Sequence, residues 1–506
     1  MILDVRNPDR ISVRSIKRIR YKILRKSVFF HIAVVILLGL LTQVWVNAAP
    51  VNNNFTAAET SLSSNTRTRV VWVQDMGDGR DVDTIGSNLR LMGFDTGDGK
   101  GERAILGKGN YAKPLITPRG DRVVYTDRIR KKLYVVNWDG SGQRELFGGF
   151  GLALWRDPQD GREWIYYGFE KMQYGGLTCP AVYRTLLDRP GTGELVWDKV
   201  PVNVDSFQLS TDGRMAGGNF PWPEGGVALL PNKEIKIFTK GCWTALATMN
   251  GKSFYWIFDG SHRNLTIFNL QNNKKWQVNI NGAPGIGGYE VYHPRWSNDP
   301  RIMAMTGPYK VGSGGNRIGG GGRQVEIYVG RFNADLTAIE SWWQATKNDR
   351  ADFFPDVWVA PAEAPKQDPA KVSGVKKTKK AKTEPVTATP TKPVPRKKSK
   401  RLVVEARLTD PSVIPTPRDI APYRRALLVN GYDVVRVISG SYRQKKIMAA
   451  HWVIEEGQVI KDARRGKGKT YRMVLERYDD HPELEGERLI MDSDEFKLPL
   501  FYELRK

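Results

Sequence analysis

The segment that decides the fold is Ile116-Thr117-Pro118-Arg119-Gly120-Asp121-Arg122-Val123-Val124-Tyr125, in which one β-rich run ends in a polar turn and a second begins. Two more such runs follow, at 133–136 and 145–147. The same order recurs at 155–167, at 209–213, at 247–258 and at 296–301. The turn glycines 120, 161, 213 and 251 are 41, 52 and 38 residues apart, close to the roughly 40 to 50 residues of a propeller blade. One unit cannot bury both its faces, so the repeat predicts a β-propeller.

The last repeat is incomplete, and this predicts how the ring closes. Residues 353–359 read as the opening strand of a blade, but a Pro/Lys-rich segment follows them. At the other end, the β-rich runs 69–75, 89–96 and 102–106 have no opening strand of their own. Joining the two ends completes a sixth blade and leaves no open sheet edge. We therefore expect a six-bladed propeller over residues 69–360. A two-sheet sandwich is the competing all-β fold, although a sandwich does not require a regular repeat.

On these motifs the chain resembles the TolB-like propellers, which carry WD-like repeats and occur among bacterial envelope proteins. The residues that carry the resemblance are Thr117-Pro118-Arg119-Gly120-Asp121, Ser210-Thr211-Asp212-Gly213 and Trp296-Ser297-Asn298-Asp299. The chain departs from the family pattern at 156–158 and 248–250, which leaves the blade boundaries open. The resemblance implies the fold and an envelope location, but a fold alone specifies little function.

The N-terminal residues 1–48 are typical of a signal peptide or an N-terminal signal anchor. Nine Lys or Arg stand against Asp4 and Asp9 in residues 1–26, and an apolar run follows at 28–46. Val46-Asn47-Ala48 offers a cleavage site, whereas an uncleaved run would anchor the protein in the inner membrane. Both alternatives predict export with the basic end cytoplasmic, and hence a periplasmic or extracellular protein. Residues 49–68 read as a flexible tether.

The formal net charge of +24 lies mostly outside the predicted folded segments. The linker 361–401 holds 13 Lys or Arg against three acidic residues and is rich in Pro, which predicts an extended, disordered segment. Its basic runs at 376–380 and 396–400 could bind an anionic surface such as lipid or a cell-wall polyanion, or could belong to a solvated spacer. Because the folded parts carry an ordinary charge and the protein is predicted to be exported, nucleic acid is disfavoured as a partner.

Residues 402–506 predict a second, small β-domain. Runs at 402–406, 426–429, 432–438, 446–454 and 471–477 read as strands, which suits a small barrel. The stretch 432–440 is similar to the opening of OB-fold modules of the netrin or metalloprotease-inhibitor type. That resemblance implies binding of proteins or glycans. An immunoglobulin-like sandwich is the alternative for this domain.

The candidate ligand site lies at the mouth of the axial channel. Residues 293–296 precede a repeated turn, which places them on an innermost strand, and 356–358 lie on the closing strand. The candidate residues are His293, Arg295, Trp296, Asp356, Trp358 and Trp243. An Arg beside Trp suits anionic or sugar ligands. The alternative is that Arg295, His293 and Asp356 satisfy one another as structural residues of the channel.

The scarcity of histidine limits the metal chemistry that the chain could support. Of five histidines, only His262 and His293 fall in the predicted propeller, so a metal there would need a carboxylate such as Asp259 or Glu290. We expect no metal and no other cofactor. Cys179 and Cys242 could form a disulfide in an oxidising compartment, or could lie too far apart and stay free.

The sequence thus predicts an exported, envelope-associated, non-enzymatic binding or scaffold protein that presents its axial face to a protein or glycan. The alternative is a glycan-active lyase or hydrolase that uses Asp259, Glu290 and Asp356 with an Arg at the channel mouth. A third hypothesis is a cell-wall anchor that works through the basic linker.

Overall fold

The computed structural model describes residues 66–173, 176–309, 318, 321–361, 401–420, 423–484, 486–493, 495 and 498–505. The predicted leader 1–48, nearly all of the tether and the linker residues 362–400 lie outside these ranges. Within the described part of the chain, no helix is both long and apolar enough to cross a membrane.

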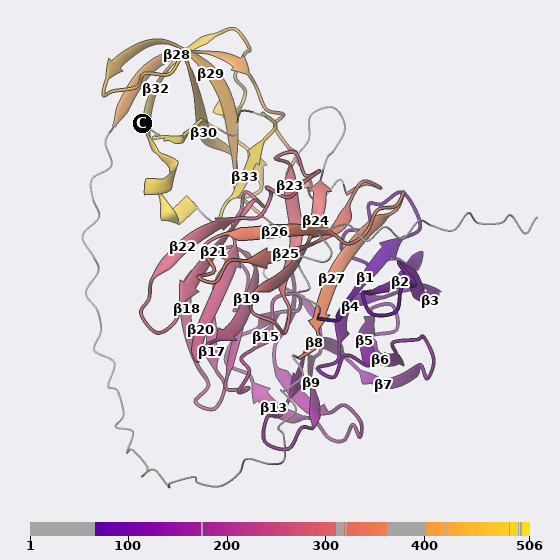
Figure 1. Cartoon of the computed structure of the whole chain (residues 1–506). Coiled ribbons are helices and arrows are strands. Elements are labelled where there is room, and N and C mark those ends of the chain that lie inside the picture. Colours follow the sequence, from indigo (N-terminus) through magenta and orange to yellow (C-terminus); the bar gives the residue numbers. More distant parts are fainter. Residues whose placement is uncertain are drawn as a thin grey trace, which may run out of the picture. The chain divides into compact units, whose positions relative to one another are not determined.

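Six four-stranded antiparallel sheets form the propeller (Figure 1). The first blade comprises β27 (Ala351–Val359), β1 (Thr68–Asp75), β2 (Leu89–Asp95) and β3 (Arg103–Gly109); the second β4 (Ala112–Ile116), β5 (Arg122–Asp127), β6 (Lys132–Asn137) and β7 (Arg144–Gly148); the third β8 (Phe150–Arg156), β9 (Glu163–Gly168), β12 (Val182–Leu186) and β13 (Glu194–Trp197). The fourth comprises β15 (Gln208–Leu209), β16 (Met215–Asn219), β17 (Glu224–Leu229) and β18 (Glu234–Lys240); the fifth β19 (Cys242–Met249), β20 (Lys252–Phe258), β21 (Asn264–Asn269) and β22 (Lys275–Asn279); the sixth β23 (Glu290–Trp296), β24 (Ile302–Tyr309), β25 (Glu326–Phe332) and β26 (Ile339–Gln344). The predicted six-bladed propeller is confirmed.

The first blade joins the two ends of the propeller sequence, as predicted. β27 pairs antiparallel with β1, from Thr68 opposite Val359 to Asp75 opposite Ala351. Figure 1 shows the orange β27 beside the indigo β1. Contacts between the first strands of the blades then run around the whole ring, in the order β27, β4, β8, β15, β19, β23 and back to β27. β10 (Lys171–Gln173), β11 (Gly176–Cys179) and β14 (Val202–Asn203) form a small extra sheet. In sequence, β10 and β11 lie between β9 and β12 of the third blade, and β14 lies between the third and fourth blades.

A tryptophan from one blade packs on the turn of another and explains the glycine of the repeat. The indole Nε1 of Trp358 donates to the carbonyl of Pro118 at 3.0 Å, and its ring lies against Gly120. Trp155 makes the same contact with the turn at Thr211 and Gly213. Both glycines have positive φ, +80° and +68°. The repeated turn therefore needs glycine for its backbone and for the space that the indole occupies.

Replacing Gly120 by alanine is expected to lower the free energy of unfolding by roughly 2–3 kcal/mol, because a strained φ costs about 1–3 kcal/mol and the indole must also move. A Cβ there would lie 2.5 Å from Cε2 of Trp358. Gly251→Ala is the matched control, since its φ is +73° but nothing lies within 4 Å of the added carbon. Urea unfolding of both variants checks the prediction, and equal losses would contradict the role given to Trp358.

The described residues between 402 and 505 form a closed five-stranded barrel with two short additional strands. The barrel strands are β28 (Leu402–Asp410), β29 (Ala426–Ser439), β30 (Lys446–Glu455), β32 (Thr470–Arg477) and β34 (Leu500–Glu503). They pair in the order β28-β29-β30-β34-β32 and back to β28, and only the β30–β34 pair among these is parallel. β31 (Gln458–Val459) and β33 (Arg488–Met491) add to this sheet, and three short 3-10 helices connect strands: η3 (Lys461–Ala463), η4 (Tyr478–Asp480) and η5 (Pro482–Leu484). A barrel, rather than a sandwich, is the observed fold.

One barrel strand is longer than the sequence predicts. The sequence predicts separate strands at 426–429 and 432–438; Asn430-Gly431, which stands between them, is a dipeptide typical of a tight turn. They form the single strand β29. Asn430 is buried inside the barrel, and Gly431 gives room for the side chain of Asp410, whose Cβ would lie 2.9 Å from an added Cβ. The pair therefore serves packing instead of chain reversal.

Buried contacts join the barrel to the propeller at the start of the inner strands. The hydroxyl of Tyr423 lies 2.7 Å from Sγ of Cys242 and 3.3 Å from Nε2 of His262. Arg488 binds both carboxylate oxygens of Glu290, at 2.9 and 2.8 Å. Both members of this ion pair are buried, so their charges depend on each other for stabilisation.

Candidate functional site

The inner strands carry a repeated bulge that decides where the candidate residues point. Lys113, His293 and Phe354 each precede a proline, and each has positive φ, between 45° and 50°. At all three positions the pairing with the next strand shifts register. Proline lacks the amide hydrogen that an unbroken ladder needs, so it is tolerated in such bulges. Trp243 on β19 has the same feature, with φ of 27° and a register shift, but without the proline.

The bulged aromatic residues fill the middle of the ring. The ring of His293 lies 4.9 Å from that of Trp243 and 4.2 Å from that of Phe354, and the last two are 5.5 Å apart. These residues come from three different blades. Burial holds the pKa of His293 well below its ordinary value, so the imidazole is neutral. His293 and Trp243, both predicted at the channel mouth, therefore pack in its interior.

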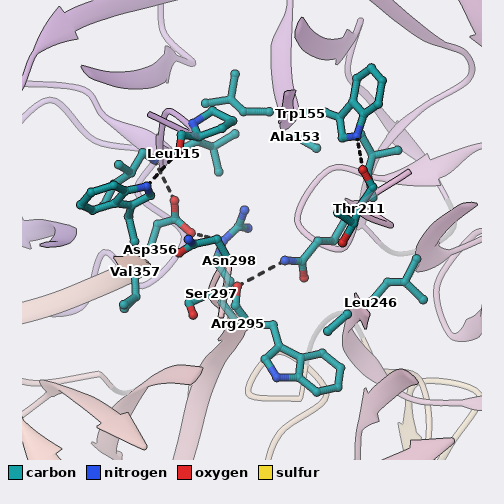
Figure 2. Close-up of a pocket in the computed structure, with 18 of the residues that line it drawn as sticks. Leu115, Ala153, Trp155, Thr211, Leu246, Arg295, Ser297, Asn298, Asp356 and Val357 are labelled. Atoms are coloured by element: carbon teal, nitrogen blue, oxygen red, sulfur yellow. Dashed lines mark hydrogen bonds and ion pairs between the residues drawn. The ribbon is translucent and has the colours of Figure 1, made fainter. Parts of the chain in front are cut away.

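A pocket of about 260 Å³ opens at the far end of the inner strands (Figure 2). Of the six predicted site residues, Arg295, Trp296, Asp356 and Trp358 line it. Other lining residues from the same ends are Trp155, Gln208, Thr211, Thr248 and Asn298. Among all the residues that line the pocket, Asp356 is the only carboxylate, and none is a histidine or a cysteine.

An ion pair holds the wall of this pocket. Nε of Arg295 lies 2.5 Å from Oδ1 of Asp356, and Oδ2 accepts a hydrogen bond from the amide of Ile116 at 2.7 Å. These contacts link the sixth, first and second blades. Figure 2 shows the guanidinium of Arg295 beside Asp356 and facing the open centre of the pocket. The side chain of Arg295 is 16% exposed, so the cation is partly desolvated but reachable.

Two of the predicted tryptophans, Trp296 and Trp358, have structural roles. Trp296 is 1% exposed, stacks on Trp256 at 4.1 Å and donates to the carbonyl of Pro300. Trp358 packs on the turn of the second blade, as described above. Trp155 is the most exposed of the three indoles at the pocket, and it is not among the residues predicted from the sequence. The run Leu154-Trp155-Arg156 at the end of an inner strand was the available signal, because it matches the positions of Trp296 and Trp358.

A buried lysine lies in the ring near the pocket and was also missed. Nζ of Lys113 donates to the carbonyl of Val204 at 2.5 Å, and the residue is 3% exposed. Burial, followed by the nearby charge of Arg295, lowers the pKa of Lys113 to about 7. The Lys113-Pro114 dipeptide repeats the pattern of His293-Pro294, which could have placed it on the axis. At neutral pH this group is close to its own titration point.

The other polar candidates serve the contact with the barrel. Nδ1 of His262 lies 3.5 Å from Oε2 of Glu290. Burial would raise the pKa of Glu290, but Arg488, His262 and Arg263 outweigh it and hold the pKa below its ordinary value. Asp259 accepts bonds within its own turn. The carboxylates of the proposed catalytic set thus have separate uses, with Asp356 alone at the pocket.

Cys179 and Cys242 are both free and buried. Cys242 contacts Tyr423, as described above, and also accepts from the indole of Trp222 at 3.3 Å. Burial raises the pKa of Cys179 to about 12, which keeps the thiol protonated. In the described ranges, no group of three or more His, Cys, Asp or Glu could hold a metal ion.

No protein-family model matches the chain, and no curated protein sequence matches it either. Solved structures give distant matches. TolB from Acinetobacter baumannii matches with a TM-score of 0.38 and 15% identity, over 57% of this chain and 66% of that one. A dihydro-heme d1 dehydrogenase, NirN, matches with a TM-score of 0.32 and 12% identity, over 55% and 64%. An oligogalacturonate lyase in complex with manganese matches with a TM-score of 0.29 and 10% identity, over 46% and 65%.

Proposed function

We propose that the protein is an exported, envelope-associated binding or scaffold protein, and that the open axial end of its propeller binds a carboxylate-bearing group of a protein or glycan partner. The observation that carries the proposal is the pocket with Arg295 on its wall. The terminal nitrogens of the Arg295 guanidinium can donate to a ligand oxygen while Nε stays hydrogen-bonded to Asp356.

The composition of the pocket favours binding over catalysis. Cleavage of a glycan by acid and base residues needs two groups placed on either side of the bond. The lining has one carboxylate, and that carboxylate already pairs with Arg295 and accepts from the amide of Ile116. Polar groups such as Gln208, Thr211 and Thr248 supply hydrogen bonds for orientation.

The other parts of the chain support the location and a second module. The basic and apolar leader of the sequence favours export, and the basic linker favours contact with an anionic surface. The barrel has five closed strands with a parallel pair between its third and fifth strands. We assign it to the OB type on this strand order and on the resemblance at 432–440. Such barrels bind oligonucleotides and oligosaccharides through exposed strands and loops.

Arg295→Gln is expected to weaken binding of a carboxylate ligand by roughly 10- to 100-fold, because a hydrogen bond to a charged group contributes about 1.5–3 kcal/mol. The measurement is a thermal-shift titration of the full chain with uronic-acid oligosaccharides, with neutral oligosaccharides and with acidic peptides. A ligand at 100 times its dissociation constant stabilises by about 2.7 kcal/mol. The oligosaccharide and peptide arms distinguish a glycan partner from a protein partner.

Two further variants sharpen this test. Arg295→Lys keeps the charge that Asp356 needs and should lose only part of the affinity. Arg214→Gln is the control, because Arg214 is an exposed arginine on a neighbouring turn and does not line the pocket. If the protein turned over an acidic oligosaccharide and Asp356→Asn abolished that turnover, the function would be catalysis and the binding proposal would be wrong.

A further inference from the structure

The C-terminal barrel contains a second cavity that lies outside the site described above. Its volume is about 710 Å³. It lies among the ends of β30, β32 and β34 and the segment around η3, with the side chains of His451, Arg464, Arg465, Arg472 and Glu503 in its lining. Five of the lining residues are Lys or Arg and three are Asp or Glu. The cavity therefore has a net positive charge even when His451 is neutral.

The hydrogen bonds of Asn430 determine which nitrogen of His451 carries the proton. The amide oxygen of Asn430 accepts from the backbone N–H of Ser412 at 2.8 Å. The amide nitrogen of Asn430 must therefore face His451, whose Nε2 lies 3.2 Å away. An amide nitrogen only donates, so Nε2 accepts and the proton of the neutral imidazole is on Nδ1. His451 thus presents a donor, Nδ1–H, on its other side.

This donor has no hydrogen-bond partner among the described residues. Nδ1 lies 4.0 Å from Oε2 of Glu503, which is too long for a hydrogen bond. That oxygen already accepts from Nη2 of Arg465 at 2.6 Å. His451 is 5% exposed, and burial, followed by the nearby Arg465, lowers its pKa to about 3. A neutral, buried donor left without a partner is costly, so an acceptor in the cavity would be stabilised there.

Arginines surround the same space. Arg465 is held in place by Glu503 and by the hydroxyl of Tyr432, at 3.1 Å from Nη1. Arg464 and Arg472 are exposed, and the structure records no side-chain partner for either in its described part. The cavity thus offers the fixed guanidinium of Arg465, two exposed guanidinium groups that can change conformation, and the neutral N–H donor of His451. Such a set of donors suits a small anionic group with several acceptor oxygens.

We propose that this cavity of the barrel is an oxyanion-binding site, which takes a sulfate, phosphate or carboxylate group between Nδ1–H of His451 and the guanidinium groups of Arg464, Arg465 and Arg472. The site is independent of the axial pocket, since no residue lines both. It gives the barrel a ligand of its own, borne on a glycan, a lipid or a free ion.

The test is isothermal titration of the full chain with sodium sulfate, sodium phosphate and sodium glucuronate at low ionic strength. The double variant Arg464→Gln/Arg472→Gln should bind the preferred probe about tenfold more weakly or worse. Arg443→Gln, an exposed arginine of the same barrel outside the cavity, should bind it as the wild type does. Arg295→Gln should leave the binding of sulfate and phosphate unchanged, which separates this site from the axial one. Glucuronate carries a carboxylate that the axial pocket could also bind, so for this probe the double variant is compared with the parent chain in the Arg295→Gln background.

The tautomer gives an independent readout. In protein labelled with ¹⁵N-histidine, the Nδ1–H proton of His451 should shift downfield on addition of the anion that binds, because the donor gains an acceptor. The preferred probe indicates whether the natural ligand carries sulfate, phosphate or carboxylate. The proposal would be overturned if the double variant bound the preferred probe as tightly as the wild type does. It would also be overturned if none of the three anions bound at about 10 mM, which is about ten times a millimolar dissociation constant.

Discussion

Arg488→Ala is expected to lower the free energy of unfolding by about 3–5 kcal/mol, the cost of leaving a buried charge without its partner. Arg488 is 3% exposed and Glu290 is 0% exposed, and Nη2 of Arg488 donates to both carboxylate oxygens of Glu290 across the contact between barrel and propeller. The truncation removes this ion pair, while His262, with Nδ1 3.5 Å from Oε2 of Glu290, and the charge of Arg263 still favour the carboxylate. Urea unfolding followed by intrinsic tryptophan fluorescence measures the loss.

A compensating variant separates the lost charge from the lost side chain. Arg488→Met with Glu290→Gln removes both charges and keeps most of the volume, so it should recover a large part of the stability that Arg488→Ala loses. If the double variant were no more stable than Arg488→Ala, packing rather than charge would be the cause. Gly260→Ala should also disrupt the contact between barrel and propeller, without a change of charge, because the added Cβ would lie 1.8 Å from the carbonyl oxygen of Glu487.

The second large effect concerns pH and the closing blade. Three carboxylates converge on Asn348: its side-chain nitrogen donates to Asp352 and Glu102, and its backbone N–H donates to Glu326, all at 2.9 Å. Burial raises the pKa of Asp352 to about 7 and that of Glu326 to about 8. The cluster joins the sixth blade to the blade that closes the ring.

Both carboxyl groups are therefore expected to weaken the fold as pH rises. In the unfolded chain they lose their protons near pH ~4, whereas the folded protein keeps them to about pH 7 and 8. Between these values the folded state binds more protons, so stability is full below about pH 4 and is lost as pH rises through 7 to 8. Because a tenfold difference in proton affinity corresponds to about 1.4 kcal/mol, the loss of stability over the whole pH range is on the order of 4–5 kcal/mol for each group.

Asp352→Asn isolates this contribution from other titrating groups. Its stability relative to the wild type should rise by on the order of 3 kcal/mol between pH 5 and pH 9. Asp349→Asn is the control for the substitution itself, since that side chain is 86% exposed and lies beside the cluster. Chemical unfolding at a series of pH values gives both curves, and parallel curves for Asp352→Asn and the wild type would refute the assignment.

The architecture was predictable from the sequence because its signals are local. Turn glycines and alternating strands repeat along the chain, and the unmatched strand 353–359 identifies the closing blade. The barrel was harder, because Asn430-Gly431 has the local signature of a turn but takes its role from tertiary contacts with Ser412 and His451. Its last strand, β34, was missed altogether; it has four residues and pairs with strands far away in the sequence.

Four of the six predicted site residues line the pocket, and the bulge at His293-Pro294 explains why His293 does not. Simple alternation places His293 and Arg295 on the same face of their strand. The bulge at His293-Pro294 shifts the register, so His293 enters the centre of the ring and Arg295 lines the pocket. Trp155 and Gln208 reach the same pocket from other blades, which a linear sequence cannot show without the ring in place. The roles of Glu290 and His262 depend on a residue about 200 positions away, Arg488.

Closure of the ring through the β1–β27 pair also has a mechanical consequence. Thr68 lies opposite Val359, and the amide of Ala360 donates to the carbonyl of Arg67 at 2.8 Å. The chain therefore enters and leaves the propeller at the same corner of one blade. A force between the preceding and the following segments would pull these two strands apart from that end, breaking their hydrogen bonds one after another instead of shearing them all together. The propeller would resist tension poorly along this direction, and the closing blade would be the first to open under load.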